Sequence, residues 1–580
     1  MNPQASMCRI LMVLLSEAII TTATSFDYVI AGGGTCGLLL ANRLSEDPNV
    51  SVAVIEPGED TRNNPNVTDA GNFITALGTS IDWAYPSTAQ PGAANRSFSF
   101  HSGKAIGGTS TINGMTYVRA DAAEIDAWEA LGNKGWNWDT LFQYYKRTER
   151  FTPPTTAQED AGASFEPQSH GYQGELHVGY RYAIPNGSFP GIVQTTWESL
   201  GYPLNPDVNS GDTRGFDVWP MTIDRNPDLR WDSARAYYYP VEGRANLVLF
   251  QGTALNIEWE EDGIDGVMSA TGVRYVDRNN QTVTLDVSKE AIISTGALRT
   301  PLLLEMSGIG NPSVLQELGI EAIIDLPGVG ENLQEQPNSN LIYVPTHNVT
   351  GYTTYATFAN AEDLFGAETA AVSSDVGSKL TAYAENAASQ GGLNASAIEK
   401  ILRIQHDLIF NKKVTIGETI TASSSGFLLT AWWCLLPFSR GRVHLASIDA
   451  YDSPMIDPQY FAADIDMTTQ VAIGKQAQSF WHAKPVAGIT ANNVTADPWS
   501  DEEWVGFITN NFEPNYHPIG TASMMARELG GVVDSELKVY GTSNVRVVDA
   551  SVLPLQLSGH LTATLYALAE RASQFIRTAA

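Results

Sequence analysis

The stretch that most constrains the fold is residues 26–56, where two short runs rich in β-branched and aromatic residues enclose a glycine turn and an apolar segment. Residues 26–31 and 50–55 are typical of strands, and residues 38–44 are typical of a helix. A strand, a turn, a helix and a second strand in this order form a βαβ unit. We therefore expect a Rossmann-like α/β domain at the start of the chain.

Three glycines in the turn, Gly32, Gly34 and Gly37, fit the spacing G-x-G-x-x-G. The first permits a tight turn, the second lets the backbone approach a pyrophosphate, and the third lets helix and strand pack closely. The helix then presents its partial positive charge to the phosphates. Glu56, at the end of the second strand, is placed to accept hydrogen bonds from a ribose. The pattern predicts dinucleotide binding, with an ordinary turn as the alternative, and the spacing alone leaves FAD and NAD open.

The composition is that of a large globular protein with an acidic surface. The chain has 580 residues, of which 43% are hydrophobic, a formal charge of −30 and a pI near 4.6. Its length predicts two or more domains. The negative charge disfavours a role on nucleic acid or on a membrane surface. No stretch reaches the roughly 18 consecutive apolar residues of a transmembrane helix, so none is expected.

Residues 1–25 resemble a signal peptide. An apolar run at residues 10–20 follows Arg9 and precedes the small and polar residues 21–25, although Glu17 interrupts the run. An uncleaved, irregular extension is the alternative. We therefore expect a secreted protein or one of a secretory or vesicular compartment. Eight N-glycosylation sequons fit that compartment, at Asn49, Asn66, Asn95, Asn186, Asn280, Asn348, Asn394 and Asn493.

Cysteine usage is sparse. Cys8 would leave with the signal peptide, so Cys36 and Cys434 remain as a possible single pair. A disulfide framework is therefore not expected, and nothing in the cysteine spacing supports a metal site.

Two of the nine histidines, His517 and His560, lie in one C-terminal stretch among small and apolar residues. Two imidazoles that enter one site from two loops would form a proton-handling pair. The alternative for each is a hydrogen-bonded histidine of the core or the surface.

Four further segments carry a family resemblance. Residues 103–117 and 296–310 resemble the two signature segments of the glucose-methanol-choline family of FAD oxidoreductases, and the resemblance spans nearly the whole chain after Phe26. Residues 515–524 and 545–554 are most similar to the fungal branch that contains glucose oxidase and FAD glucose dehydrogenase. The resemblance implies non-covalently bound FAD and an oxidoreductase that acts on CH–OH groups.

The resemblance also implies roles for individual residues. His517 would be the general base and His560 its partner. The positions implied to contact FAD are Gly32, Gly34, Thr35, Cys36, Gly37, Glu56, Pro57, Thr109, Asn113, Gly114, Met115, Thr116, Asp549, Ala550 and Leu561. The positions implied to contact substrate are Phe73, Glu418, Trp433, Glu513 and Asn515, and no metal ligand is expected.

The resemblance further implies a division into domains. A discontinuous, Rossmann-like FAD-binding domain is expected in residues 26–180, 228–330 and 535–580, and an α+β substrate domain with an antiparallel sheet in residues 181–227 and 331–534. Strands of the first sheet are predicted at 246–250, 290–294 and 545–548, followed by a closing helix at 561–576. The second domain is predicted to hold amphipathic helices within 370–408 and strands at 428–436 and 442–445.

Two departures from the glucose-active relatives bear on the substrate. Those relatives carry an arginine at the position of Glu513 and a tyrosine at the position of Phe73. A site that loses a donor to sugar hydroxyls should lose affinity for that sugar. The alternative is that Glu513 points to solvent or pairs elsewhere.

The leading hypothesis is a fungal-type enzyme that oxidises a primary or cyclic alcohol, such as a hydroxymethyl group of a secondary metabolite. A sugar dehydrogenase or oxidase is the alternative within enzymes, and a flavoprotein that binds FAD without turnover is the alternative of another class. Oxygen or a quinone-like compound would accept the electrons, and a homodimer is possible.

Overall fold

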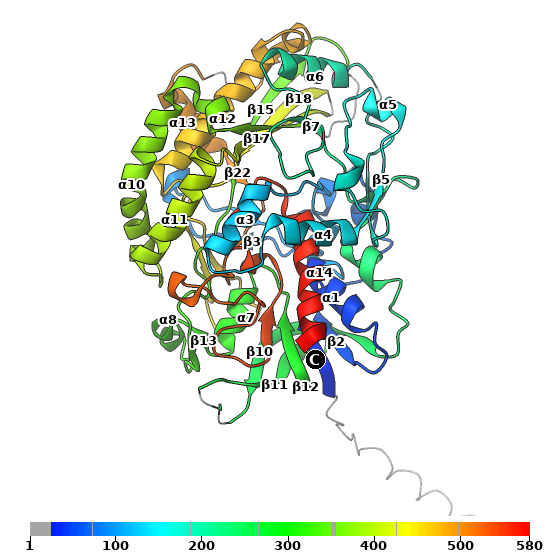
Figure 1. The fold of residues 1–580 in the computed structure, drawn as a ribbon, viewed down its shortest axis with the longest axis vertical. Helices are drawn as coiled ribbons and strands as arrows, with labels where there is room; N and C mark the ends of the chain where they lie inside the picture. The colour runs from blue at the N-terminus through cyan, green and yellow to red at the C-terminus, as the bar shows by residue number, and fades with distance from the viewer. Residues whose placement is uncertain are drawn as a thin grey trace, which may run out of the picture.

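The computed structural model describes residues 25–579, except 72, 186, 262, 265, 350–354, 425, 450 and 496–497. The predicted signal peptide therefore lies outside the described residues, apart from Ser25. Figure 1 shows two sheets with helices around them, one at each end of an elongated molecule. The α/β fold class predicted from the sequence is confirmed.

The glycine turn lies inside the predicted βαβ unit. Strand β1 (Ser25–Ala31), helix α1 (Thr35–Leu44) and strand β2 (Val52–Glu56) follow one another, and β1 pairs with β2 in parallel. All residues of β2 and all residues of α1 after Thr35 are buried. This continuous burial is what a parallel strand covered by a helix requires.

The first sheet has six strands among the described residues. They are β1, β2, β10 (Leu247–Trp259), β11 (Ala270–Asp277), β12 (Thr282–Ile293) and β23 (Val545–Val547). The first half of β10 pairs with β2 in parallel, while its second half pairs with β11 in the antiparallel sense. The strands predicted at 246–250 and 290–294 are therefore confirmed, but both strands are longer than predicted because each also pairs with β11.

The second sheet is antiparallel and has seven strands among the described residues, six of them on its main path. They are β7 (Gly215–Val218), β16 (Tyr355–Asn360), β17 (Thr415–Ser424), β18 (Phe427–Cys434), β15 (Pro337–Pro345) and β21 (Thr490–Asn493), with β22 (Glu513–Pro514) paired to β15 beside them. β1 begins one residue before the range predicted for the first domain, and the division into domains stays a prediction.

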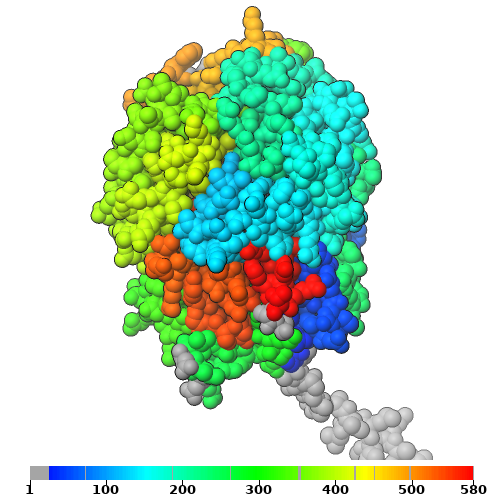
Figure 2. All heavy atoms as spheres, viewed as in Figure 1, coloured from blue at the N-terminus to red at the C-terminus, as the bar shows by residue number. Residues whose placement is uncertain are grey.

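The longer helices cover the two sheets and the seam between them (Figure 1). They are α3 (Ala122–Ala130), α4 (Trp138–Thr148), α6 (Phe189–Ser199), α7 (Thr300–Met306), α10 (Thr369–Gln390), α11 (Ala395–Phe410), α12 (Asp464–His482), α13 (Asp501–Asn511) and α14 (Leu561–Ala579). Figure 2 shows segments far apart in the chain side by side, with the red C-terminal helix between blue N-terminal and orange late residues.

Two expectations differ from the structure. The run at 442–445 forms β19 (Arg442–His444), which pairs only with β20 (Met455–Asp457) and stands outside the second sheet. Cys36 and Cys434 are both buried free thiols, so the single pair considered from the sequence does not form. Cys36 lies on α1 and Cys434 ends β18, because each is drawn into the core of a different sheet.

A buried histidine at the end of β19 contacts α7 and the loop that contains Glu331. His444 Nδ1 lies 2.6 Å from Glu305 Oε1, and His444 Nε2 lies 3.3 Å from Glu331 Oε1. Although burial lowers the pKa of His444, the two carboxylates outweigh it and raise that pKa to about 9. A group whose pKa is raised on folding stabilises the protein below its unfolded pKa and loses that contribution as the pH rises through the folded pKa.

We predict that His444→Gln lowers the free energy of unfolding by about 3 kcal/mol near pH 6, since a rise from 6.5 to about 9 has that value. The difference between wild type and variant should shrink as the pH approaches and passes 9. Thermal unfolding midpoints across pH 6 to 10 measure it. A pH-independent difference would contradict the charged state of His444.

Candidate active site

At two positions of the glycine turn, only glycine fits. Gly32 has φ of +104°, and a Cβ there would lie 2.3 Å from the Ser294 carbonyl oxygen. A Cβ on Gly37 would lie 2.0 Å from the Gly32 carbonyl oxygen. The turn is therefore pressed against the end of β12 on one side and against α1 on the other.

The start of α1 offers backbone amides to an anion. Gly34 is the N-cap of α1 and makes no side-chain capping bond, and both Gly34 and Thr35 are half-buried. Unpaired amides at a helix N-terminus are a natural phosphate site. The side chain of Cys36 turns the other way, with Sγ 3.5 Å from the Leu565 carbonyl oxygen, so only its backbone can face a phosphate.

Glu56 closes the other side of the turn. Its Oε2 accepts a hydrogen bond from the Gly33 amide at 2.9 Å, and its Oε1 accepts one from the Gly58 amide at 2.8 Å. Burial raises the pKa of Glu56 to about 7, against these hydrogen bonds. Each carboxylate oxygen keeps a second lone pair, so hydroxyl donors of a ribose would favour the ionised form. The turn and Glu56 fit the adenosine and pyrophosphate part of a dinucleotide.

The segment at 103–117 links the glycine turn to the C-terminal helix. The Gly107 amide donates to the Gly33 carbonyl oxygen at 2.8 Å. Asn113 Nδ2 donates to Thr562 Oγ1 at 3.2 Å, while Asn113 Oδ1 accepts from Arg230 Nη1 at 2.8 Å. These bonds place the predicted flavin-lining residues directly beside the start of α14.

Several other predicted cofactor residues lie around this segment. Asp549 is buried, and its carboxylate accepts from the Gly296 amide, Thr300 Oγ1 and the Ser551 amide and hydroxyl. Its side chain is thus occupied by the protein, which leaves the backbone of Asp549 and Ala550 to face a cofactor. Met115 is buried with φ of +62°, and Thr109 is exposed and accepts from the Gly103 amide.

His517 and His560 meet face to edge. Their ring centroids are 5.0 Å apart and the ring planes are 86° apart. His517 lies after β22, and His560 lies directly before α14. Loops from the two ends of the C-terminal stretch therefore bring both imidazoles to one point. No other ring joins this pair except Trp433, whose ring is 5.9 Å from that of His560, among the ring contacts of the described residues.

Gln336 fixes the proton position on His517. Gln336 Nε2 donates to the carbonyl oxygens of Leu435 at 2.9 Å and Leu557 at 3.4 Å, so its Oε1 must face the ring. That oxygen lies 2.8 Å from His517 Nδ1 and also accepts from Asn515 Nδ2 at 3.0 Å. The acceptor oxygen of Gln336 at 2.8 Å is closer to Nδ1 than the donor Nδ2 of Asn515 at 3.1 Å, so we assign the hydrogen to Nδ1, which leaves Nε2 of the neutral ring as an acceptor.

His560 is held by an acid from the second sheet. His560 Nε2 lies 3.1 Å from Glu418 Oε1, and an ionised Glu418 accepts this hydrogen bond. Burial raises the pKa of Glu418, and the contact with His560 offsets part of that rise. Glu418 and Trp433 lie opposite each other on β17 and β18, so one pair of strands supports His560 from below.

The loop before His560 is fixed by two contacts with the first domain. Buried Glu124 accepts from the Ser558 amide at 2.9 Å and from the Ser558 hydroxyl at 2.9 Å. A Cβ on Gly559 would lie 2.3 Å from the Arg119 carbonyl oxygen. The backbone next to His560 is therefore pinned between α3 and residues 118–119, and the ring has little freedom to move.

The surroundings of His517 favour its neutral form. Burial, with a smaller contribution from nearby His560, holds the pKa of His517 well below its usual value. The His517 amide donates to Glu335 Oε1 at 3.1 Å, and burial raises the pKa of Glu335 to about 8. A neutral imidazole thus stands over a buried carboxyl group.

The predicted substrate residues do not all reach the histidines. Asn515 Nδ2 lies 3.1 Å from His517 Nδ1, so this residue is in the centre. Phe73 is 39% exposed, and its ring edge is 3.8 Å from where a Cβ of Gly114 would stand. The side chain of Glu513 is 56% exposed and faces Arg96 at 3.4 Å, so Glu513 lies at the rim of the site.

Sequence reasoning missed the residues that hold the histidines in place, namely Gln336, Glu335, Glu124 and Gly559. None belongs to a periodic pattern, and Glu124 is 434 positions from Ser558. The only local signal was a glycine directly before His560.

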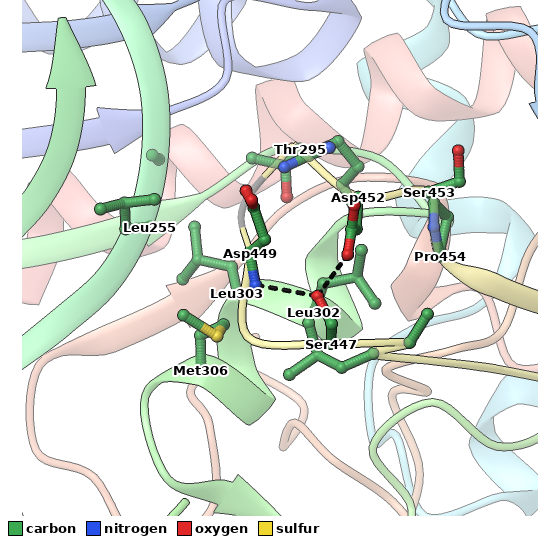
Figure 3. Close-up of a pocket in the computed structure, with 14 residues that line it drawn as sticks. Leu255, Thr295, Leu302, Leu303, Met306, Ser447, Asp449, Asp452, Ser453 and Pro454 are labelled. Carbon is green, nitrogen blue, oxygen red and sulfur yellow. Dashed lines mark hydrogen bonds between the residues drawn. The ribbon is translucent and has the colours of Figure 1, made fainter. Parts of the chain in front are cut away.

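A small hollow lies between α7 and residues 445–449 and 452–454 (Figure 3). Leu302, Leu303 and Met306 line one side, and on the other the Asp449 amide donates to Ser447 Oγ at 3.0 Å. Its volume is about 20 Å³, which is room for a water molecule but not for a substrate.

Among the described residues no helix is long and apolar enough to cross a membrane, and no group of three or more potential metal ligands occurs.

Comparison with known proteins gives one consistent answer over nearly the whole chain. Family profiles described as GMC oxidoreductase match residues 26–338 and 437–569. The chain is 51% identical over 563 residues to the glucose oxidase-like protein fsoC of Humicola fuscoatra, covering 96% of each chain. It is 34% identical over 575 residues to the glucose oxidase of Aspergillus carbonarius, covering 97% of this chain and 94% of that protein.

A solved structure is similar over the same length. An FAD-dependent oxidoreductase from Chaetomium thermophilum superposes with a TM-score of 0.88 at 28% identity, covering 96% of this chain and 99% of that chain. The likeness therefore includes both sheets and the seam between them.

We predict that Gly559→Ala destabilises the protein by about 1–3 kcal/mol and displaces His560 from Glu418, because the added methyl group has no space beside Arg119. Gly506→Ala on α13 is the matched control, since a Cβ there meets nothing within 4 Å. Chemical denaturation and a crystal structure of each variant measure the two effects. Equal stability of the two variants would show that the loop gives way freely.

Proposed function

Because the chain belongs to the GMC oxidoreductase family, we propose that it uses FAD to oxidise the CH–OH group of a primary or cyclic alcohol, with His517 as the general base. Membership of this family makes the protein an FAD-dependent oxidoreductase, related to glucose oxidase. The substrate and the roles of individual residues are proposals.

The observation that carries this proposal is the contact between Gln336 Oε1 and His517 Nδ1 at 2.8 Å. Gln336 Oε1 takes the hydrogen bond from Nδ1, which leaves Nε2 as a free acceptor next to His560. Removal of a hydroxyl proton requires such an acceptor within hydrogen-bond reach. Bound FAD supplies the acceptor for the hydride that leaves the carbinol carbon.

His560 complements the base. Its ring stands edge to face with His517, so both imidazoles can reach one hydroxyl oxygen. The Glu418 carboxylate accepts a hydrogen bond from His560 Nε2 and so holds the ring beside the hydroxyl oxygen that loses its proton to His517. Glu418 therefore acts as a positioning residue for His560 rather than as a contact to the substrate.

A sugar oxidase or dehydrogenase is the second candidate. Asn515 and Trp433 stand beside the histidines, and the relatives that match the chain include glucose oxidases. Against this candidate, Glu513 presents a carboxylate instead of a donor at the rim, and its partner Arg96 also donates to the carbonyl oxygens of Thr509 and Phe512. A sugar would find few free donors there.

The acceptor and the compartment follow as parts of the proposal. Oxygen or a quinone-like compound would reoxidise the flavin, and relatives named as oxidases favour oxygen. The apolar run at residues 10–20 supports passage through the secretory pathway.

We predict that His517→Ala slows flavin reduction by an alcohol by roughly a hundredfold or more while FAD stays bound, because only the proton acceptor is lost. His347→Ala is the matched control, since His347 is exposed and remote from the ring pair. Anaerobic stopped-flow bleaching of the flavin measures the rate, and the flavin absorbance of the purified protein measures FAD content. Unchanged reduction in His517→Ala would rule out this residue as the base.

We predict that flavin reduction stays fast on the acid side down to a pH well below 6.5. The base works only when neutral, and both burial and His560 lower the pKa of His517. The rate should fall only when the pH reaches that lowered pKa. The anaerobic reduction rate as a function of pH measures this, with FAD retention followed at each pH. An acid limb with its midpoint at or above 6.5 would contradict the assignment.

A further inference from the structure

Strand β18 has two very different faces. Leu428, Thr430 and Trp432 are fully buried, and the Trp432 indole donates to the Gln470 carbonyl oxygen of α12. On the other face, exposure rises along the strand from Trp433 at 2% through half-buried residues to Phe427 at 44%. One face thus packs under a helix, while the other opens gradually away from the histidines.

The register of the sheet extends this open face over three strands. Residues opposite each other in an antiparallel sheet point to the same side. Trp433 faces Glu418 on β17 and Asn338 on β15 and forms the first row, directly under His560. Two further rows lie beyond it, made of Asn340, Ala431 and Ile420 and then of Ile342, Leu429 and Ala422.

The chemistry of these rows changes with distance from the histidines. The first row carries an acid, an amide and an indole, whereas the third row carries only aliphatic side chains. All members of the second and third rows are half-buried. When one face of an antiparallel sheet meets solvent, its side chains are normally polar. An apolar face that is partly open is therefore typical of a binding surface.

The length of this face suits a substrate larger than a simple sugar. From Trp433 to Phe427 the strand advances about 20 Å at roughly 3.3 Å per residue. The face is continuous with the row that supports His560, and among its members beyond the first row only Asn340 is polar. An apolar surface attached to an alcohol-oxidising centre has an evident occupant, which is the rest of the alcohol.

We propose that the substrate is a lipophilic alcohol whose hydroxyl reaches His517 and His560 while its apolar body lies along the face formed by Ile420, Leu429 and Phe427. This inference rests on the proposed alcohol oxidation and adds the substrate class. The half-buried aliphatic side chains gain from covering an apolar body, whereas a polyhydroxylated sugar would leave its hydroxyls without partners there.

The test uses the purified FAD-loaded enzyme and a series of primary alkanols from butanol to dodecanol, with cyclohexylmethanol as a compact analogue and glucose as the polar comparison. The second-order rate constant of anaerobic flavin reduction should rise with chain length by roughly fourfold per methylene until the face is filled. Glucose should be slower than the long alkanols.

Two variants locate the effect. Leu429→Asn and Ile420→Asn put polar groups on the face, and the ratio of the rate constants for dodecanol and butanol should fall by at least about tenfold in each. Val248→Asn is the matched control, because Val248 is an apolar strand residue of the first sheet that is 38% exposed. Its ratio should equal that of the wild type.

Each outcome decides between distinct conclusions. Turnover of short and long alkanols at equal rates would overturn this inference and leave alcohol oxidation standing. No flavin reduction by any alkanol, together with rapid reduction by glucose, would overturn both the leading proposal and this inference. If light scattering shows a dimer, and Leu429→Asn dissociates that dimer, the face binds a second copy of the chain. That outcome would also overturn the inference of a lipophilic substrate.

Discussion

The site depends on the parallel packing of α1 against α14. The two helices touch near their starts, where Cys36 Sγ approaches the Leu565 carbonyl oxygen, and further along, where Arg43 and Glu570 form a buried ion pair at 2.8 Å. Helices aligned in this way bring their N-termini to the same end. One N-terminus carries the glycine turn proposed to hold the cofactor phosphates, and the other follows His560. One packing contact therefore brings the proposed phosphate site and the histidine pair to the same end.

Residues in and next to the second sheet hold the two histidines in place. Glu418 and Trp433 support His560, and Gln336, just before β15, orients His517. These polar groups are buried, where an unpaired amide or carboxylate is costly, so each hydrogen bond strongly restricts the ring that it contacts. The histidine pair is therefore held by contacts from both sheets, and the position of His560 also depends on the tightly packed loop at Gly559.

The sequence shows the charge of Glu513 but not the residue that it contacts. Its charge reversal was visible in the sequence, but its partner Arg96 lies more than four hundred residues earlier and is brought to it only by folding. The apolar face of β18 was equally invisible, because residues 427–433 are apolar on both faces apart from the buried Thr430. Periodicity cannot separate a face buried under α12 from one that is half open when both are apolar.

The sequence by itself determined the βαβ unit, the glycine turn, the acid at its tip and the two histidines, because these depend on local geometry and on residue type. It also carried the family resemblance and with it FAD. Only the tertiary structure decided the proton position on His517, the free state of Cys36 and Cys434, the rim position of Glu513 and the graded face beyond Trp433. Each of these rests on contacts between residues far apart in the chain, and such contacts exist only after the two sheets have packed together.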